Sequence, residues 1–204
     1  MLEINGFRKA KKKSFATNST TFSLQNCVNV VAKANRALGF VRRNIKSCSR
    51  ETKLMCYITL IRPVLEYACS AWDPFLVSHI NSLEMVQRRA ARFILNDYDR
   101  DSSVSKMLEN IGLNNLTTRR LKSRLALLYK IDTKLTPMDV PVSVKRKDHN
   151  GRTDNGKAYI HMQSHSNIFH NSFYVRTIRD WNALANEIVS CSSLESFVNK
   201  LTRI

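Results

Sequence analysis

Apolar residues recur at helical spacing in several separate stretches, and the first of these stretches covers residues 27–45. Its apolar positions step by four and three residues: Cys27, Val31, Ala34, Leu38, Val41 and Ile45. This spacing places them on one side of a helix of nearly five turns. The cations of the stretch, among them Arg42 and Arg43, lie off the apolar stripe and are expected to face solvent.

The stretch 59–98 has an interrupted first half and a regular second half. Pro63 cannot donate a backbone hydrogen bond, and Asp73 followed by Pro74 ends the first half. In the second half one helical face is formed by Ile80, Leu83, Ala90 and Ile94. Its opposite side carries three cations: Arg88, Arg89 and Arg92.

Capping residues divide the remaining helices. Ser47 or Ser49 is expected to cap a helix over 51–61, and Ser103 a short helix closed by Gly112. Thr117 or Thr118 then opens a helix with the stripe Leu121, Leu125, Leu128 and Ile131. The first turns of this helix are crowded with cations, which include Arg119, Arg120 and Arg124. Cations are unfavourable at a helix N-terminus, so either a phosphate ligand or solvent screening would offset them.

The tail after residue 136 mixes loop, strand and helix signals. Two short apolar runs, 158–162 and 168–170, predict a β-hairpin. A helix is expected over about 176–185, with Trp181 in the core. Ser192 and Glu195 read as a capping box that opens a last helix.

These patterns together predict a mainly α protein. We expect a disordered basic arm over 1–26, a helical bundle over 27–136, and a smaller α+β part over 137–204 with a loop, a short hairpin and two helices.

Composition adds a strong imbalance of charge. The chain has 33 Lys and Arg against 16 Asp and Glu, a formal net charge of +17 in 204 residues. Such a surface attracts polyanions, with nucleic acid the leading class and an anionic membrane surface the second; a merely basic protein is the alternative. The five cysteines are odd in number and form no CxxC pair, which indicates a reducing compartment. No apolar run reaches the length of a membrane span. With the reducing compartment that the cysteines indicate, we expect an intracellular protein, nuclear and/or cytoplasmic.

Three long sequence segments carry a family resemblance. RPVLEYACSAWDPF and LEMVQRRAARFILNDY lie in the stretch 59–98, and NSFYVRTIRDWNAL begins at Asn171. They resemble the region after the catalytic palm in jockey-like non-LTR (LINE-type) retrotransposon reverse transcriptases, and the likeness extends from about Cys27 to Leu201. The resemblance implies the thumb and C-terminal region of an RNA-directed DNA polymerase, encoded by a truncated copy. The intact parent enzyme would use magnesium, and the partners would be RNA, an RNA–DNA duplex, or a palm domain supplied in trans.

Polymerase chemistry itself is not expected from this chain. Two metal-binding carboxylates are required. The resemblance implies that one of them comes from a pair of adjacent aspartates, and the sequence contains no such pair. The aspartates of 97–101 do not fit a calcium loop, because Ser102 replaces the glycine and Leu108 the final glutamate. Three histidines at 161, 165 and 170 lack the companions of a zinc site and are read as loop residues. We therefore predict no catalytic residues, no metal and no cofactor in this chain.

Basic helical faces remain as the candidate site. Lys and Arg spaced along a surface contact phosphates without reading sequence. The candidates form three groups on three predicted helices: Arg42 and Arg43; Arg88, Arg89 and Arg92; and Arg119, Arg120 and Arg124. Two alternatives are a non-catalytic interaction module, which packs its amphipathic helices on a protein partner, and an unstable relic that aggregates through exposed apolar stripes.

Overall fold

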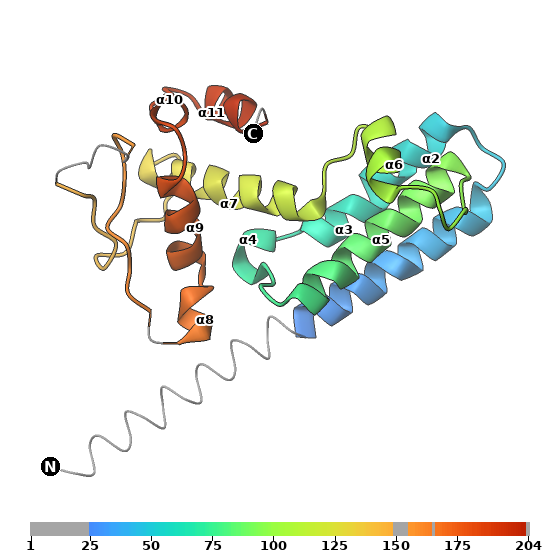
Figure 1. Cartoon of the computed structure of the whole chain (residues 1–204), viewed down its shortest axis with the longest axis horizontal. Coiled ribbons are helices and arrows are strands. Elements are labelled where there is room, and N and C mark those ends of the chain that lie inside the picture. Colours follow the sequence, from blue (N-terminus) through green and yellow to red (C-terminus); the bar gives the residue numbers. More distant parts are fainter. Residues whose placement is uncertain (1–24, 149–154, 165, 203–204) are drawn as a thin grey trace, which may run out of the picture. The chain divides into compact units, whose positions relative to one another are not determined.

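The computed structural model describes residues 25–148, 155–164 and 166–202, and this part of the chain is mainly helical (Figure 1). It forms two compact units, which divide between Arg119 and Arg120. The arm predicted over 1–26 lies outside the described residues except for residues 25 and 26, which are already helical.

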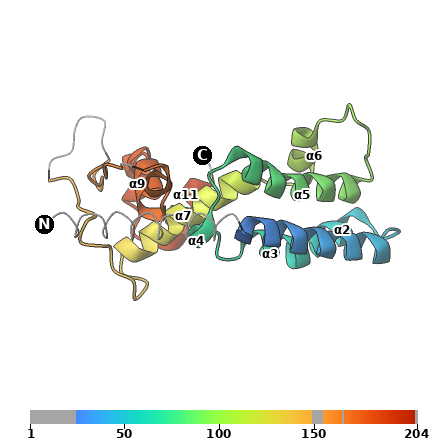
Figure 2. The same cartoon turned by 90° about the horizontal axis from the view of Figure 1, so that it is seen from below.

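The first unit is built from helices that bury their apolar stripes against one another. A helix over 25–44 is followed by α2 (Arg50–Cys56), the π-helix η1 (Tyr57–Ile61), α3 (Arg62–Glu66) and α4 (Cys69–Trp72), and then by α5 (Val77–Leu95) and α6 (Val104–Asn110). Their shared core includes Leu38 and Val41 from the first helix and Val86 and Ala90 from α5. Most residues of the apolar stripes predicted for the two long helices therefore belong to this core. Figure 2 shows the helix over 25–44 and α5 in two separate layers of the first unit.

Local caps explain where several of these helices begin and end. The Ser49 side chain accepts a hydrogen bond from the Thr52 N–H at the start of α2, as one of the two predicted caps. Asn96 ends α5 in the left-handed conformation, with φ 54°. Gly112 closes α6 with φ 66°, and the N–H of Leu113 bonds back to the carbonyl of Leu108.

Pro63 shapes the segment before it. The expected helix over 51–61 is interrupted at η1, where the N–H of Arg62 bonds to the carbonyl of Tyr57, five residues back. A proline ring clashes with the carbonyl four residues before it and offers no N–H, so one widened turn accommodates it. Pro63 then lies in the first turn of α3, where its missing donor costs nothing.

The second unit packs around Trp181, which is fully buried. It comprises most of α7 (Leu116–Asp132), then α8 (Asn167–His170), α9 (Phe173–Asn182), α10 (Asn186–Val189) and α11 (Leu194–Leu201). The Trp181 indole N–H donates to the Lys157 carbonyl at 3.0 Å, and its ring lies 5.7 Å from that of Phe197. The prediction of Trp181 as a core residue is confirmed.

Two predictions for the tail are wrong. Residues 168–170 belong to α8, because the Ser166 side chain accepts from the Phe169 N–H and starts a helical turn there. The segment at Tyr159 instead forms an isolated antiparallel bridge with Arg146, so the hairpin pairing with 168–170 is absent. The cap of α11 is Ser193, which accepts from the Ser196 N–H, and not Ser192.

Candidate nucleic-acid interface

The helix over 25–44 and α5 run side by side in the same direction (Figure 1). Three contacts between them, or just beyond their ends, establish this. The Cys27 thiol donates to the His79 carbonyl at 3.7 Å, Arg89 donates to the Asn35 side-chain oxygen at 3.1 Å, and Arg42 lies 5.9 Å from the centre of the Tyr98 ring. Because both residue numbers increase together from contact to contact, the two helices are parallel.

The solvent side of α5 carries three arginines and no exposed acid. Arg88 and Arg89 are exposed and Arg92 is half-buried. At about 100° per residue these three side chains leave the helix within an arc of about 100°. The acid of α5, Glu84, is buried and bonded to Thr117 at the start of α7, so it does not neutralise this face.

The neighbouring helix has the same character. Residues 25–50 contain six cations and neither Asp nor Glu; the cations are Lys33, Arg36, Arg42, Arg43, Lys46 and Arg50. Two parallel helices therefore present cationic solvent faces without an exposed acid on either helix. This arrangement suits a polyanion, because the phosphates would meet cations and no exposed carboxylate of either helix would repel them.

A small hollow lies where the two helices end. It measures about 430 Å³ and is lined by Gly39, Arg42, Arg43, Lys46, Phe93 and Tyr98. The cations also lie in the last turn of the first helix or just after it, where the negative end of the helix dipole stabilises them. Arg92 donates to the Asp99 carbonyl, which ties the next loop to the end of α5. Three cations and two aromatic residues therefore line the same hollow.

The third predicted group has a different environment. The Arg119 guanidinium pairs through two nitrogens with the Glu66 carboxylate of α3, and this hydrogen bonding raises the pKa of Arg119. Arg124 is buried and lies 3.0 Å from Asp180. Arg120 is only 3% exposed. Carboxylates thus pair with two of these arginines, Arg119 and Arg124, and the third, Arg120, is buried. Only five of the eight candidates therefore remain open to a ligand.

Other predicted features can be placed as well. In the aspartate run, Asp97 and Asp99 accept backbone bonds from the residues two positions later, which makes consecutive turns. His165 lies outside the described residues, and His170 is part of α8. Among the residues that the structure describes, no group of three or more His, Cys, Asp or Glu side chains could hold a metal ion. Within the same residues, no helix has both the length and the apolar character needed to cross a membrane.

The sequence-based list of site residues omitted Lys46 and Tyr98, which complete the hollow with Arg42 and Arg43. The acid-free run over 25–50 could have indicated Lys46. Tyr98 lies in a polar turn, and nothing local marks it as a neighbour of a helix more than 50 positions earlier. Comparisons of the chain with protein-family models, curated proteins and solved structures found no match.

Proposed function

We propose that this chain binds nucleic acid through phosphate contacts, without sequence preference, as the thumb-like region of a non-LTR retrotransposon reverse transcriptase. The observation that carries the proposal is the pair of parallel helices whose exposed ionisable groups are all cations. The proposed ligand is RNA or an RNA–DNA duplex, and the proposed location is nuclear or cytoplasmic. The contacting residues are Arg42, Arg43, Arg88, Arg89 and Arg92.

The proposal includes no catalysis by this chain. Phosphoryl transfer needs carboxylates that clamp metal ions, and magnesium would belong to the intact parent enzyme. Primer extension by the purified chain would contradict this part of the proposal.

A matched pair of charge reversals tests the binding surface. Arg88→Glu with Arg89→Glu changes the cationic face, whereas Arg100→Glu with Lys106→Glu makes the same change of charge at exposed residues outside the two helices. With an RNA–DNA duplex, the first pair should lower affinity at least about tenfold and reduce the salt slope by about 2. The control pair should have a much smaller effect, and circular dichroism should confirm that both variants remain folded.

Equal losses of affinity in the two pairs of variants would mean that only overall charge matters, and the proposed face would be withdrawn.

The second candidate function is a non-catalytic interaction module, for instance one that packs on a palm domain supplied in trans. It is favoured by Met55 of α2 and Leu60 of η1, which are 60% and 51% exposed. Binding to a protein partner that survives the Arg88 and Arg89 reversals would support it.

A further inference from the structure

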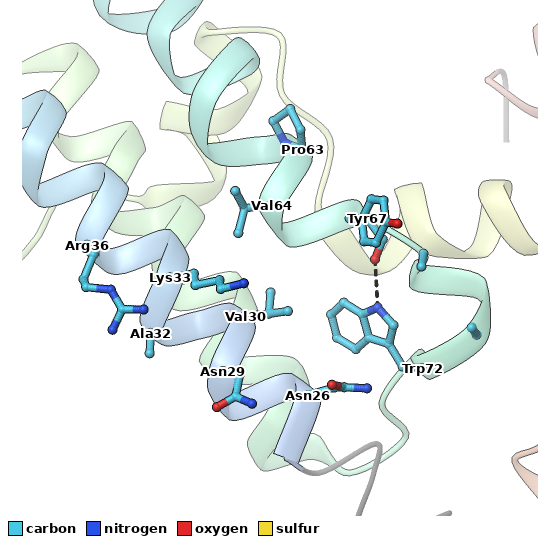
Figure 3. A pocket seen from close by; sticks show the side chains of 12 residues that line it. Asn26, Asn29, Val30, Ala32, Lys33, Arg36, Pro63, Val64, Tyr67 and Trp72 are labelled. Atoms are coloured by element: carbon cyan, nitrogen blue, oxygen red, sulfur yellow. Dashed lines mark hydrogen bonds between the residues drawn. The ribbon is translucent and has the colours of Figure 1, made fainter.

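A second groove lies in the first unit, beside the start of the helix over 25–44 (Figure 3). It measures about 770 Å³, within the range of ligand pockets, which is about 300–1,000 Å³. Its lining comes from that helix on one side and from residues 63–72 on the other, and it contains no Asp or Glu. Apolar surface, amides and cations are therefore combined here without an opposing charge.

One wall is a line of polar side chains along the helix. Asn26, Asn29, Lys33 and Arg36 are separated by three, four and three residues, so they follow one helical face. The line spans about 15 Å at a rise of about 1.5 Å per residue. Amides at one end can bond to polar edges of a ligand, and cations at the other end can bind its negative charges.

The opposite wall offers an aromatic surface on a fixed backbone corner. The Tyr67 side chain is 80% exposed. Ala68, which follows it, has φ 48°, a left-handed conformation that is unfavourable for a residue with a Cβ atom. The Trp72 indole N–H donates to the Tyr67 carbonyl at 2.8 Å and holds this corner in place (Figure 3). A strained corner that presents a large ring to solvent indicates a binding role.

We propose that this groove binds an unpaired nucleic-acid strand, with a base stacked on Tyr67 and phosphates at Lys33 and Arg36. Proteins bind single strands by combining aromatic platforms with a cationic track, and both are present here. Asn26 and Asn29 would bond to base edges, since an amide both donates and accepts. The inference rests on the proposed function and extends it from duplex phosphates to unpaired bases.

The charge of the groove decides between occupants. A basic segment would be repelled by Lys33 and Arg36. A protein occupant would have to be acidic, and it would not need a protruding aromatic ring with amides opposite. A nucleotide strand uses all three features: the ring, the amides and the cations.

Binding of three ligands to the full chain tests the inference. The ligands are a blunt RNA–DNA duplex, a single-stranded oligonucleotide of about eight nucleotides, and the same oligonucleotide with abasic positions, which keeps its phosphates but lacks bases. We expect the complete single strand to bind about tenfold more tightly than its abasic form. Tyr67→Ala should abolish this difference, and Tyr67→Phe should preserve it because the stacking surface remains.

Leu60→Ala is the matched control, since Leu60 is exposed but does not line the groove. Tyr67→Ala should leave duplex affinity unchanged, whereas the Arg88 and Arg89 reversals should weaken it. Equal binding of the complete and abasic strands, or a base-dependent difference that survives Tyr67→Ala, would overturn the inference and leave the groove to an acidic protein partner. Failure of the duplex to bind would instead overturn the proposed function. A difference in affinity between the complete and abasic strands that is lost in Tyr67→Ala would still support binding of an unpaired strand in the groove.

Discussion

Glu84 of α5 accepts two hydrogen bonds from Thr117 at the start of α7, one from the backbone N–H at 2.9 Å and one from the hydroxyl at 3.1 Å. The carboxylate therefore caps a helix N-terminus, where negative charge is favourable. The same contact removes the acid of α5 from solvent. This interaction thus stabilises the start of α7, and it also leaves no exposed acid on α5.

Replacement of Glu84 should destabilise the first unit. Glu84→Ala removes a buried acceptor and should lower the free energy of unfolding by about 1–3 kcal/mol. Glu84→Gln retains an oxygen that can accept from Thr117 and should cost less. Glu109→Ala, at an exposed position of α6, is the control and should change stability by less than about 0.5 kcal/mol. Urea unfolding followed by circular dichroism measures all three, and equal effects of Glu84→Ala and Glu109→Ala would contradict the capping role.

Arg119 should contribute to stability and not to ligand binding. Arg119→Gln breaks the bidentate pair with Glu66 and should lower the free energy of unfolding by up to about 1 kcal/mol, because both partners are partly exposed. Its affinity for an RNA–DNA duplex should equal that of the unsubstituted chain. Arg88→Gln should show the opposite behaviour, with unchanged stability and weaker binding. A loss of affinity in folded Arg119→Gln similar to that of Arg88→Gln would place Arg119 in the interface.

Tyrosine burial predicts a loss of stability at alkaline pH. Burial raises the pKa of Tyr57, with a smaller contribution from Glu66, and burial together with the bond to Asp132 raises the pKa of Tyr159. The folded state therefore keeps protons that the unfolded state releases near pH 10, the ordinary tyrosine value. Stability should be unaffected by these groups below about pH 10 and should fall above it.

The contribution of one tyrosine can be isolated. In Tyr159→Phe the fall of the urea midpoint between about pH 9 and 11 should be shallower than in the unsubstituted chain. Identical slopes in Tyr159→Phe and the unsubstituted chain would show that the Tyr159 pKa is not raised by folding.

Ala68 offers a test of the strained corner. Glycine adopts a positive φ without steric cost, so Ala68→Gly should raise the free energy of unfolding by up to about 1 kcal/mol. Ala32→Gly is the control in a regular, exposed helical turn and should lower it by about 1 kcal/mol. Destabilisation of similar size in both variants, measured by urea unfolding, would contradict the left-handed geometry at Ala68.

The sequence predicted the features that depend on local periodicity. The stripe from Cys27 to Ile45 supplies the face that packs in the core, with Val31 and Ile45 at its partly buried margin. Gly112 ends α6 as expected, since only the residue and its neighbours determine that geometry. The mainly helical fold follows from such signals.

Features set by distant partners were not predictable in this way. Glu66 and Asp180 lie 53 and 56 positions from the arginines they bind, so nothing near Arg119 or Arg124 marked them as paired. The domain boundary was expected after residue 136 but falls inside α7, because Leu125 and Leu128 of that helix belong to the second core. The prediction of a hairpin was wrong because Ser166 caps a helix at the short apolar run that contains Ile168, so this run is helical and not a strand.

The most direct test of the central claim is the affinity of the unsubstituted chain for an RNA–DNA duplex across a series of salt concentrations. If Arg42, Arg43, Arg88, Arg89 and Arg92 each neutralise one phosphate, log affinity should fall against log salt with a slope of about −4.5, at about −0.9 per phosphate. A slope near zero, or no binding at low salt by a folded sample, would contradict a phosphate-binding role for the paired helices.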